Sequence, residues 1–220
     1  MALHRRFWPL EQLLTRDLRP GDLMLQVNSG TVASRLIEWA QRLAHQLDSQ
    51  VVHGAVMFDN NFMVEALGHG IQASDLRVQN AAYGYLVYRP RREDLAKRAA
   101  KCAKAMFEIN QSHKNLSYPL PHKMAGSLSA NSGAAPGADE MVKLFNRIRE
   151  GAKQPFFCSQ FVVFVYQFAG QQMGYNPNAI FAASAARVSP STLASLLQTN
   201  SYFEEAGYVM AGERLKKLDA

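Results

Sequence analysis

Apolar residues recur along this chain with two periods, one typical of strands and one typical of helices. Short apolar runs bounded by turn residues predict strands. These strands are expected at residues 23–27, 51–58, 62–66, 71–76 and 84–89, with a hairpin or strand at 202–210. Helical spacing predicts helices at 31–47, 91–110, 138–150 and 190–198. We therefore expect an α+β fold.

One further helix is apolar on almost every side. It begins at Cys158 and runs to about residue 169, and such a helix belongs in the middle of a domain. Pro155 suits the start of this helix and Gly170 suits its end. Cys158 then lies in the first turn, where free backbone N–H groups and the helix dipole favour a thiolate over a thiol.

A lone buried cysteine is also a common core residue, so this helix alone does not identify a nucleophile. A catalytic cysteine needs a base, and the base needs an orienting partner. Of the six histidines, only His53 begins a strand that otherwise reads as core. Glu65 interrupts the apolar return strand and is the obvious partner. The alternative is a core histidine with its hydrogen bonds satisfied and a surface glutamate.

The loop between the two strands decides whether His53 and Glu65 can meet. A three-residue loop at 59–61 places Ala55 opposite Glu65. His53 then shares the sheet face of Glu65, displaced by two residues, which long side chains can span. A two-residue loop places them on opposite faces, because a slip of one residue reverses every side chain. A site that includes Cys158 therefore requires an odd loop or a bulge in this hairpin.

The two cysteines, Cys102 and Cys158, are too few for a disulfide framework. Cys102 falls on the apolar face of the predicted helix at 91–110, and we interpret it as core filling. We expect no metal and no other cofactor. The alternative is a zinc site with acceptable ligand types but no usual ligand spacing. Its ligands would be His53, Glu65, His69 and Cys158.

Length and composition predict one domain, residues 1–220, with an ordinary hydrophobic core. The least regular sequence lies at about 110–150, which we interpret as a flexible insertion of helix and loop. No stretch approaches 18 uninterrupted apolar residues, so we expect no transmembrane segment.

The net charge of +6 is moderate, and its simplest interpretation is solvated basic faces. The alternative is attraction to an anionic cell-wall polymer, a membrane surface or nucleic acid. No nucleic-acid motif accompanies the charge, so nucleic acid is not an expected partner. The N-terminal segment is basic but lacks the apolar core of a signal peptide. We expect synthesis in the cytoplasm, with export, where it occurs, by a specialised machine.

Three segments together resemble the NlpC-type papain-like cysteine peptidases. They are LRPGDLMLQ at 18–26, the hairpin with HGAV at 53–56 and VEA at 64–66, and FCSQFV at 157–162. In most of that superfamily the cysteine precedes the histidine, whereas here it follows by about a hundred residues. This order resembles the circularly permuted, YiiX-like branch, with lecithin:retinol acyltransferase and its relatives nearby. VSPSTL at 188–193 is similar to the segment after the nucleophile helix in that branch.

The resemblance implies a permuted papain-like fold, in which an antiparallel sheet packs against a buried helix that carries the nucleophile. Cys158 would be the nucleophile, His53 the base and Glu65 the residue that orients the imidazole. The backbone N–H of Cys158 would contribute to an oxyanion hole. Ser159 and Tyr118 are the candidates for contacts with substrate. The chain departs from the family pattern at Gly54, Phe157 and Gln160, and these departures leave the substrate open.

The resemblance further implies a cysteine hydrolase of amide bonds, acting on peptidoglycan stem peptides or on other N-acyl or isopeptide linkages. With the basic charge and the insertion, it suggests a bacterial effector toxin that acts in a target periplasm. Its expected partners are then a secretion machinery and an immunity protein. Two alternatives stay open: a lipid acyltransferase or thioesterase that uses the same Cys-His-Glu site, and an inactive binding module on the same scaffold.

Overall fold

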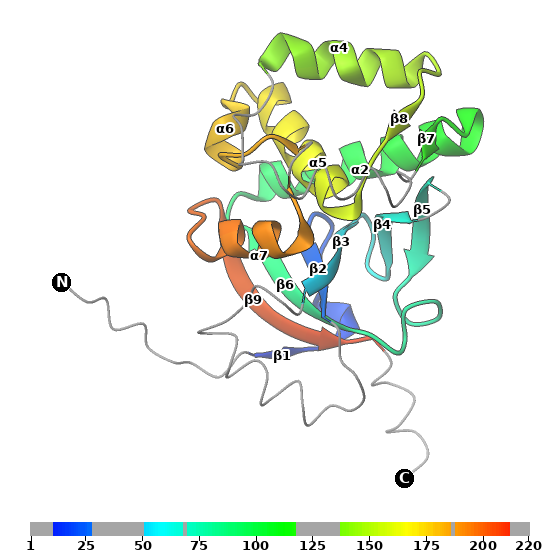
Figure 1. Cartoon of the computed structure of the whole chain (residues 1–220). Helices are drawn as coiled ribbons and strands as arrows, with labels where there is room; N and C mark the ends of the chain where they lie inside the picture. Colours follow the sequence, from blue (N-terminus) through cyan, green and yellow to red (C-terminus); the bar gives the residue numbers. More distant parts are fainter. Residues whose placement is uncertain (1–10, 28–50, 68–69, 118–136, 186–187, 212–220) are drawn as a thin grey trace, which may run out of the picture.

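The computed structural model of the chain describes residues 11–27, 51–67, 70–117, 137–185 and 188–211. These residues form a mixed sheet of seven strands with helices packed over it, which is an α+β fold (Figure 1). The predicted helix at 31–47, His69, Tyr118 and much of the expected insertion lie outside the described residues.

The strand order in the main sheet is β1-β9-β6-β2-β3-β4-β5. Its strands are β1 (Gln12–Leu13), β2 (Leu23–Val27), β3 (Val51–Met57), β4 (Phe62–Leu67), β5 (Gly70–Asp75), β6 (Gly84–Pro90) and β9 (Phe203–Met210). The strands lie close to their predicted positions. The expectation of a purely antiparallel sheet was wrong, because β1 pairs with β9 in parallel. A separate parallel pair joins β7 (Leu116–Ser117) to β8 (Gln154–Pro155).

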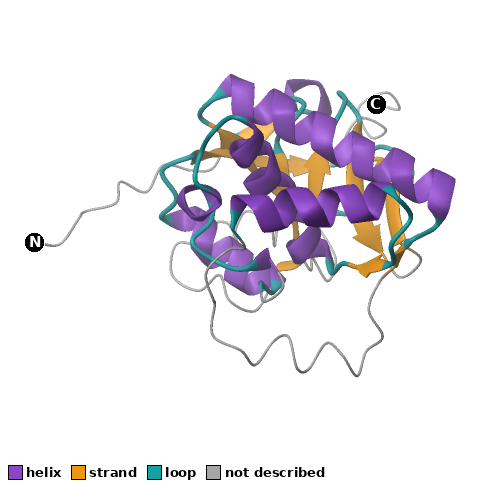
Figure 2. Cartoon of the chain, turned by 90° about the horizontal axis from the view of Figure 1, so that it is seen from above, coloured by secondary structure: helices purple, strands orange, loops and turns teal. Residues whose placement is uncertain are grey.

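The helices gather on one side of the sheet (Figures 1 and 2). They are α2 (Glu93–His113), α4 (Ala138–Arg149), α5 (Cys158–Gln172), α6 (Pro177–Ile180) and α7 (Pro190–Gln198), with a short 3-10 helix, η1 (Thr15–Asp17), before β2. The start of α7 follows from its sequence, because the Ser189 hydroxyl accepts the backbone N–H of Thr192 at 3.1 Å.

Helix α5 is the buried centre of the fold. Every residue from Cys158 to Gly170 is buried, and the helix contacts β3 and β4 as well as α2, α4, α6 and α7. Both predicted boundary signals were wrong in detail. Pro155 belongs to β8, and the helix continues two residues beyond Gly170. Glycine is required at 170 for packing, because a Cβ there would lie 2.7 Å from Cγ1 of Ile180.

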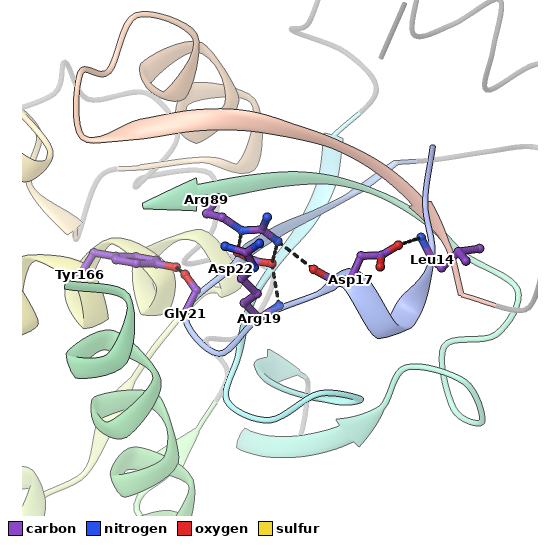
Figure 3. A network of polar contacts seen from close by, with 7 residues as sticks. All are labelled: Leu14, Asp17, Arg19, Gly21, Asp22, Arg89 and Tyr166. Carbon is purple, nitrogen blue, oxygen red and sulfur yellow. Dashed lines mark hydrogen bonds and ion pairs between the residues drawn. The ribbon is translucent and has the colours of Figure 1, made fainter. Parts of the chain in front are cut away.

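A tight turn leads from η1 into β2 and is fastened to α5. The hydroxyl of Tyr166 donates to the carbonyl of Gly21 at 2.6 Å (Figure 3). Gly21 has φ +87°, and a Cβ there would lie 2.2 Å from the carbonyl oxygen of Ala96 in α2. Only glycine suits this backbone and this close approach.

The carboxylate of Asp22 fixes the same turn to β6. Asp22 is buried, and the Arg89 guanidinium donates to its two oxygens at 2.8 and 2.7 Å (Figure 3). The carboxylate also accepts the backbone N–H of Arg19 at 2.8 Å, and Arg89 reaches the carbonyl of Asp17 at 3.0 Å. Such a bidentate ion pair is stronger and more directional than a single hydrogen bond. It holds the start of β2 in place beside β3, which carries His53.

Candidate active site

The hairpin of β3 and β4 has the register that the site requires. The backbone N–H of Phe58 donates to the carbonyl of Phe62 at 3.0 Å, which leaves a three-residue loop at 59–61. Ala55 lies opposite Glu65 across the hairpin. His53 and Glu65 therefore share one face of the sheet, and of the two loop lengths considered the structure has the one that the site requires.

The two side chains meet inside the protein. Nε2 of His53 lies 2.7 Å from Oε2 of Glu65, and Glu65 is only 2% exposed. The alternative of a surface glutamate is therefore wrong. The other carboxylate oxygen, Oε1, accepts a hydrogen bond from the hydroxyl of Ser74 on β5. Hydrogen bonds thus reach both oxygens of the buried carboxylate.

Strands β3 and β4 part beyond this point. Their pairing ends at Ala55 and Glu65, although β4 continues to pair with β5 as far as Leu67. The N-terminus of α5 lies against both strands, and the backbone N–H of Gly54 is directed at the sulfur of Cys158. The sulfur also lies close enough to the imidazole of His53 for each group to shift the pKa of the other. Since Nε2 faces Glu65, the nitrogen left for Cys158 is Nδ1.

A second irregularity lies beside His53 on the other edge of β3. His53 pairs with Gln26 of β2, but the next pair joins Val27 to Val51, so position 52 is an extra residue on β3. Such a bulge bends a strand and re-aims the neighbouring side chain. The bulge and the end of the β3–β4 pairing lie on either side of His53, which interacts with both Cys158 and Glu65.

The surroundings of Cys158 favour a thiolate. Burial by itself raises the pKa of its thiol, but the hydrogen bond and charge of His53, with the N–H groups of Gly54 and Ser159, bring the pKa below its usual value. Cys158 is the first residue of α5, where the backbone N–H groups have no hydrogen-bond partner within the helix. This is the position expected from the sequence.

His53 is correspondingly stabilised as a cation. Burial lowers its pKa, but the bonds to Cys158 and Glu65 outweigh burial and raise the pKa of His53 to about 9. The pKa of Glu65 is raised by burial and lowered by His53, Ser74 and Asn80, and the net direction is down. These shifts favour the charged forms of all three groups, a thiolate, an imidazolium and a carboxylate, over their neutral forms.

The other predicted site residues have different surroundings. The Ser159 side chain is buried, and its hydroxyl donates to the carbonyl of Val188 at 2.5 Å. Its contact with substrate stays a prediction, and so does that of Tyr118, which the structure does not describe. The side chain of Gln160 accepts the backbone N–H of Phe157 at 3.2 Å and caps α5.

Cys102 contrasts with Cys158. It lies in α2, buried among apolar side chains, and burial raises its pKa to about 12. Its interpretation as core filling is confirmed. Within the described ranges, no group of three or more His, Cys, Asp and Glu side chains could hold a metal ion. His69 of the alternative zinc set lies outside those ranges.

Three residues around Glu65 were not expected from the sequence: Ser74, Asn80 and Tyr85. All three are buried, and each influences the pKa of Glu65 or is influenced by its charge. Ser74 lies on β5 opposite Met63, which is two residues before Glu65 on β4. The only sequence signal was a polar residue within a short apolar strand, which is too common to assign a role.

None of the helices that the structure describes combines the length and apolar character needed to cross a membrane. Comparisons of the chain with protein-family models, curated proteins and solved structures give no match.

Proposed function

We propose that this protein is a cysteine hydrolase of amide bonds, with a circularly permuted papain-like fold. The observation that carries the proposal is the line of three groups at the N-terminus of α5. Nε2 of His53 lies 2.7 Å from Oε2 of Glu65, and the same imidazole and the sulfur of Cys158 each stabilise the charged form of the other. A nucleophile, a base and an orienting carboxylate in this order are the parts that acyl transfer requires.

The reaction begins with the Cys158 thiolate, which attacks the carbonyl carbon of the amide. The carbonyl oxygen takes the electron pair, and the N–H groups at the start of α5 stabilise its negative charge. The tetrahedral intermediate collapses, the C–N bond breaks, and imidazolium His53 gives its proton to the leaving amine. The product of this half-reaction is a thioester on Cys158.

Water completes the cycle. Neutral His53 takes a proton from a water molecule, whose oxygen attacks the thioester carbonyl. The C–S bond breaks, Cys158 leaves as the thiolate, and the acyl group departs as a carboxylic acid. Glu65 holds the imidazole ring through Nε2 in both half-reactions and stabilises its positive charge.

We propose peptidoglycan stem peptides as the substrate class, because the three segments that resemble NlpC-type peptidases are the segments that meet at the site. They contribute β2, the β3–β4 hairpin and the first turn of α5. In this proposal the protein is an effector that acts on a target cell wall, and its partners are a secretion machinery and an immunity protein.

The test incubates purified sacculi and isolated muropeptides with the wild-type protein, with Cys158→Ala and with Cys102→Ala. We expect cleaved stem peptides from the wild type and from Cys102→Ala, and none from Cys158→Ala. The Cys102→Ala control removes a buried thiol that the reaction does not use. Intact sacculi and muropeptides at high wild-type concentration would contradict the wall substrate. An acyl adduct on Cys158 formed from phospholipid alone would instead indicate a lipid acyltransferase.

A further inference from the structure

The carboxylate that orients His53 is itself held by a second layer of polar side chains. Glu65 sits on β4, and its Oε1 accepts the hydroxyl of Ser74 from β5, while its Oε2 faces His53. Ser74 is 3% exposed, so solvent does not compete for its hydroxyl. A carboxylate that accepts hydrogen bonds at both oxygens can remain ionised in a buried position.

The geometry of the sheet fixes this contact. Met63 pairs with Ser74 and Glu65 pairs with Gln72 across β4 and β5, so Ser74 is diagonal to Glu65 on the same face. The backbones of both strands are joined along this ladder, from Phe62 to Leu67. Ser74 therefore holds the carboxylate on the side away from His53, level with Met63, where β3 and β4 are still paired.

We propose that Ser74 is a positioning residue, which holds Glu65 ionised and aimed at Nε2 of His53. This inference rests on the proposed function, since it assigns Ser74 a part in keeping the imidazole of that site charged. Ser74 acts through Glu65 and does not contact the reacting atoms.

The groups that face Glu65 come from several elements, and each bears on its charge. His53 from β3 is the titrating partner of Glu65, and Cys158 from α5 titrates with His53. Asn80, in the loop before β6, favours the ionised carboxylate. Tyr85 lies on β6 near Glu65. Its burial and the negative charge of Glu65 both raise the pKa of its phenol, so the phenol stays neutral at working pH. Ser74 is the group among these whose hydroxyl donates to Oε1.

The experiment compares Ser74→Thr with Ser74→Val, which have the same shape and differ in the hydroxyl. The pKa of His53 is measured in the intact protein by NMR titration of its imidazole Cε1–H, assigned with His53→Gln. The ionisation of Cys158 is followed below pH 8 through thiolate absorbance at 240 nm, against Cys158→Ala. Ser74→Ala also removes the hydroxyl, and it adds no methyl group to the buried site.

We expect Ser74→Val and Ser74→Ala to lower the pKa of His53 by up to about one pH unit, because the Glu65 carboxylate is then less firmly held against Nε2. Ser74→Thr should restore the wild-type value. Tyr166→Phe is the control, because it removes a buried hydroxyl of α5 that donates to Gly21, away from Glu65, and should not move the titration.

Equal His53 titrations in Ser74→Val and Ser74→Thr would overturn the role of Ser74. If the wild type keeps its raised His53 pKa and its Cys158 thiolate in that case, the proposed function still stands. If wild-type His53 titrates as an ordinary histidine and Cys158 is a thiol at pH 7, the proposed function fails, and the inference fails with it.

Discussion

Ala55 lies directly opposite Glu65 across the hairpin, and this pair is the last one before β3 and β4 part. The pairing places the Glu65 carboxylate on the sheet face of His53, where the two side chains meet at 2.7 Å. The end of the pairing leaves the backbone N–H of Gly54 directed at the Cys158 sulfur. One position in the register thus sets the contact of His53 with Glu65 and the contact of Gly54 with Cys158.

Glu65→Gln keeps the shape of the side chain and removes its charge. We expect hydrolysis to fall by about 100-fold or more, because the imidazolium loses the carboxylate that stabilises and orients it. The pKa of His53 should fall below about 9 at the same time. Measurement of kcat/KM with the NMR titration checks both. Glu204→Gln, which changes an exposed carboxylate, is the control, and equal rates in the two variants would contradict the role of Glu65.

The pH profile of hydrolysis should be bell-shaped. His53 must carry a proton to release the amine, so activity should decline as pH rises through about 9. The acid limb should lie below the usual thiol pKa, because His53 and the N–H groups of α5 lower the pKa of Cys158. The check is kcat/KM measured from pH 4 to 10. An alkaline limb near the ordinary histidine value would be inconsistent with an imidazolium held between Cys158 and Glu65.

The two cysteines should differ strongly in reactivity. At pH 7 we expect iodoacetamide to label Cys158 at least about ten times faster than Cys102, since the thiolate is the reactive form. Burial raises the pKa of Cys102 to about 12, whereas the pKa of Cys158 is lowered. Peptide mass spectrometry measures both rates in one sample. Similar rates would argue for an inactive binding module.

Removal of the Arg89 guanidinium should destabilise the fold. Arg89→Met leaves the buried charge of Asp22 without its partner, and we expect the free energy of unfolding to fall by roughly 3 kcal/mol. Arg91→Met breaks an exposed ion pair with Glu204 and should change the free energy of unfolding by less than about 1 kcal/mol. Urea unfolding of the two variants measures the difference. Equal losses would mean that the Asp22 contacts do not hold the turn.

Local signals in the sequence located most elements. The apolar run after Phe157 predicted the buried helix, and Ser189 before Pro190 predicted the start of α7. Strand alternation also gave the condition for the site, since a three-residue loop at 59–61 places Ala55 opposite Glu65, and this is the loop in the structure. These features depend on neighbours along the chain, so the sequence could indicate them.

Other features depend on contacts between distant segments. Gly170 read as a helix end, but its small size serves the approach of Ile180. The parallel addition of β1 to β9 joins the two ends of the described chain and carries no local signal. Ser74 could not be assigned either, since its partner Glu65 becomes its neighbour only when β4 and β5 pair.

By itself the sequence determined which residues could form the site: a cysteine at a helix start, a histidine in a core strand and a glutamate on the return strand. Only the tertiary structure decided that the three meet. The end of the β3–β4 pairing, the extra residue on β3 and the packing of α5 against the two strands bring Cys158 to the free side of His53. Side-chain alternation is a local property of the backbone, whereas the approach of a helix to a strand about a hundred residues away is set by packing of the whole core.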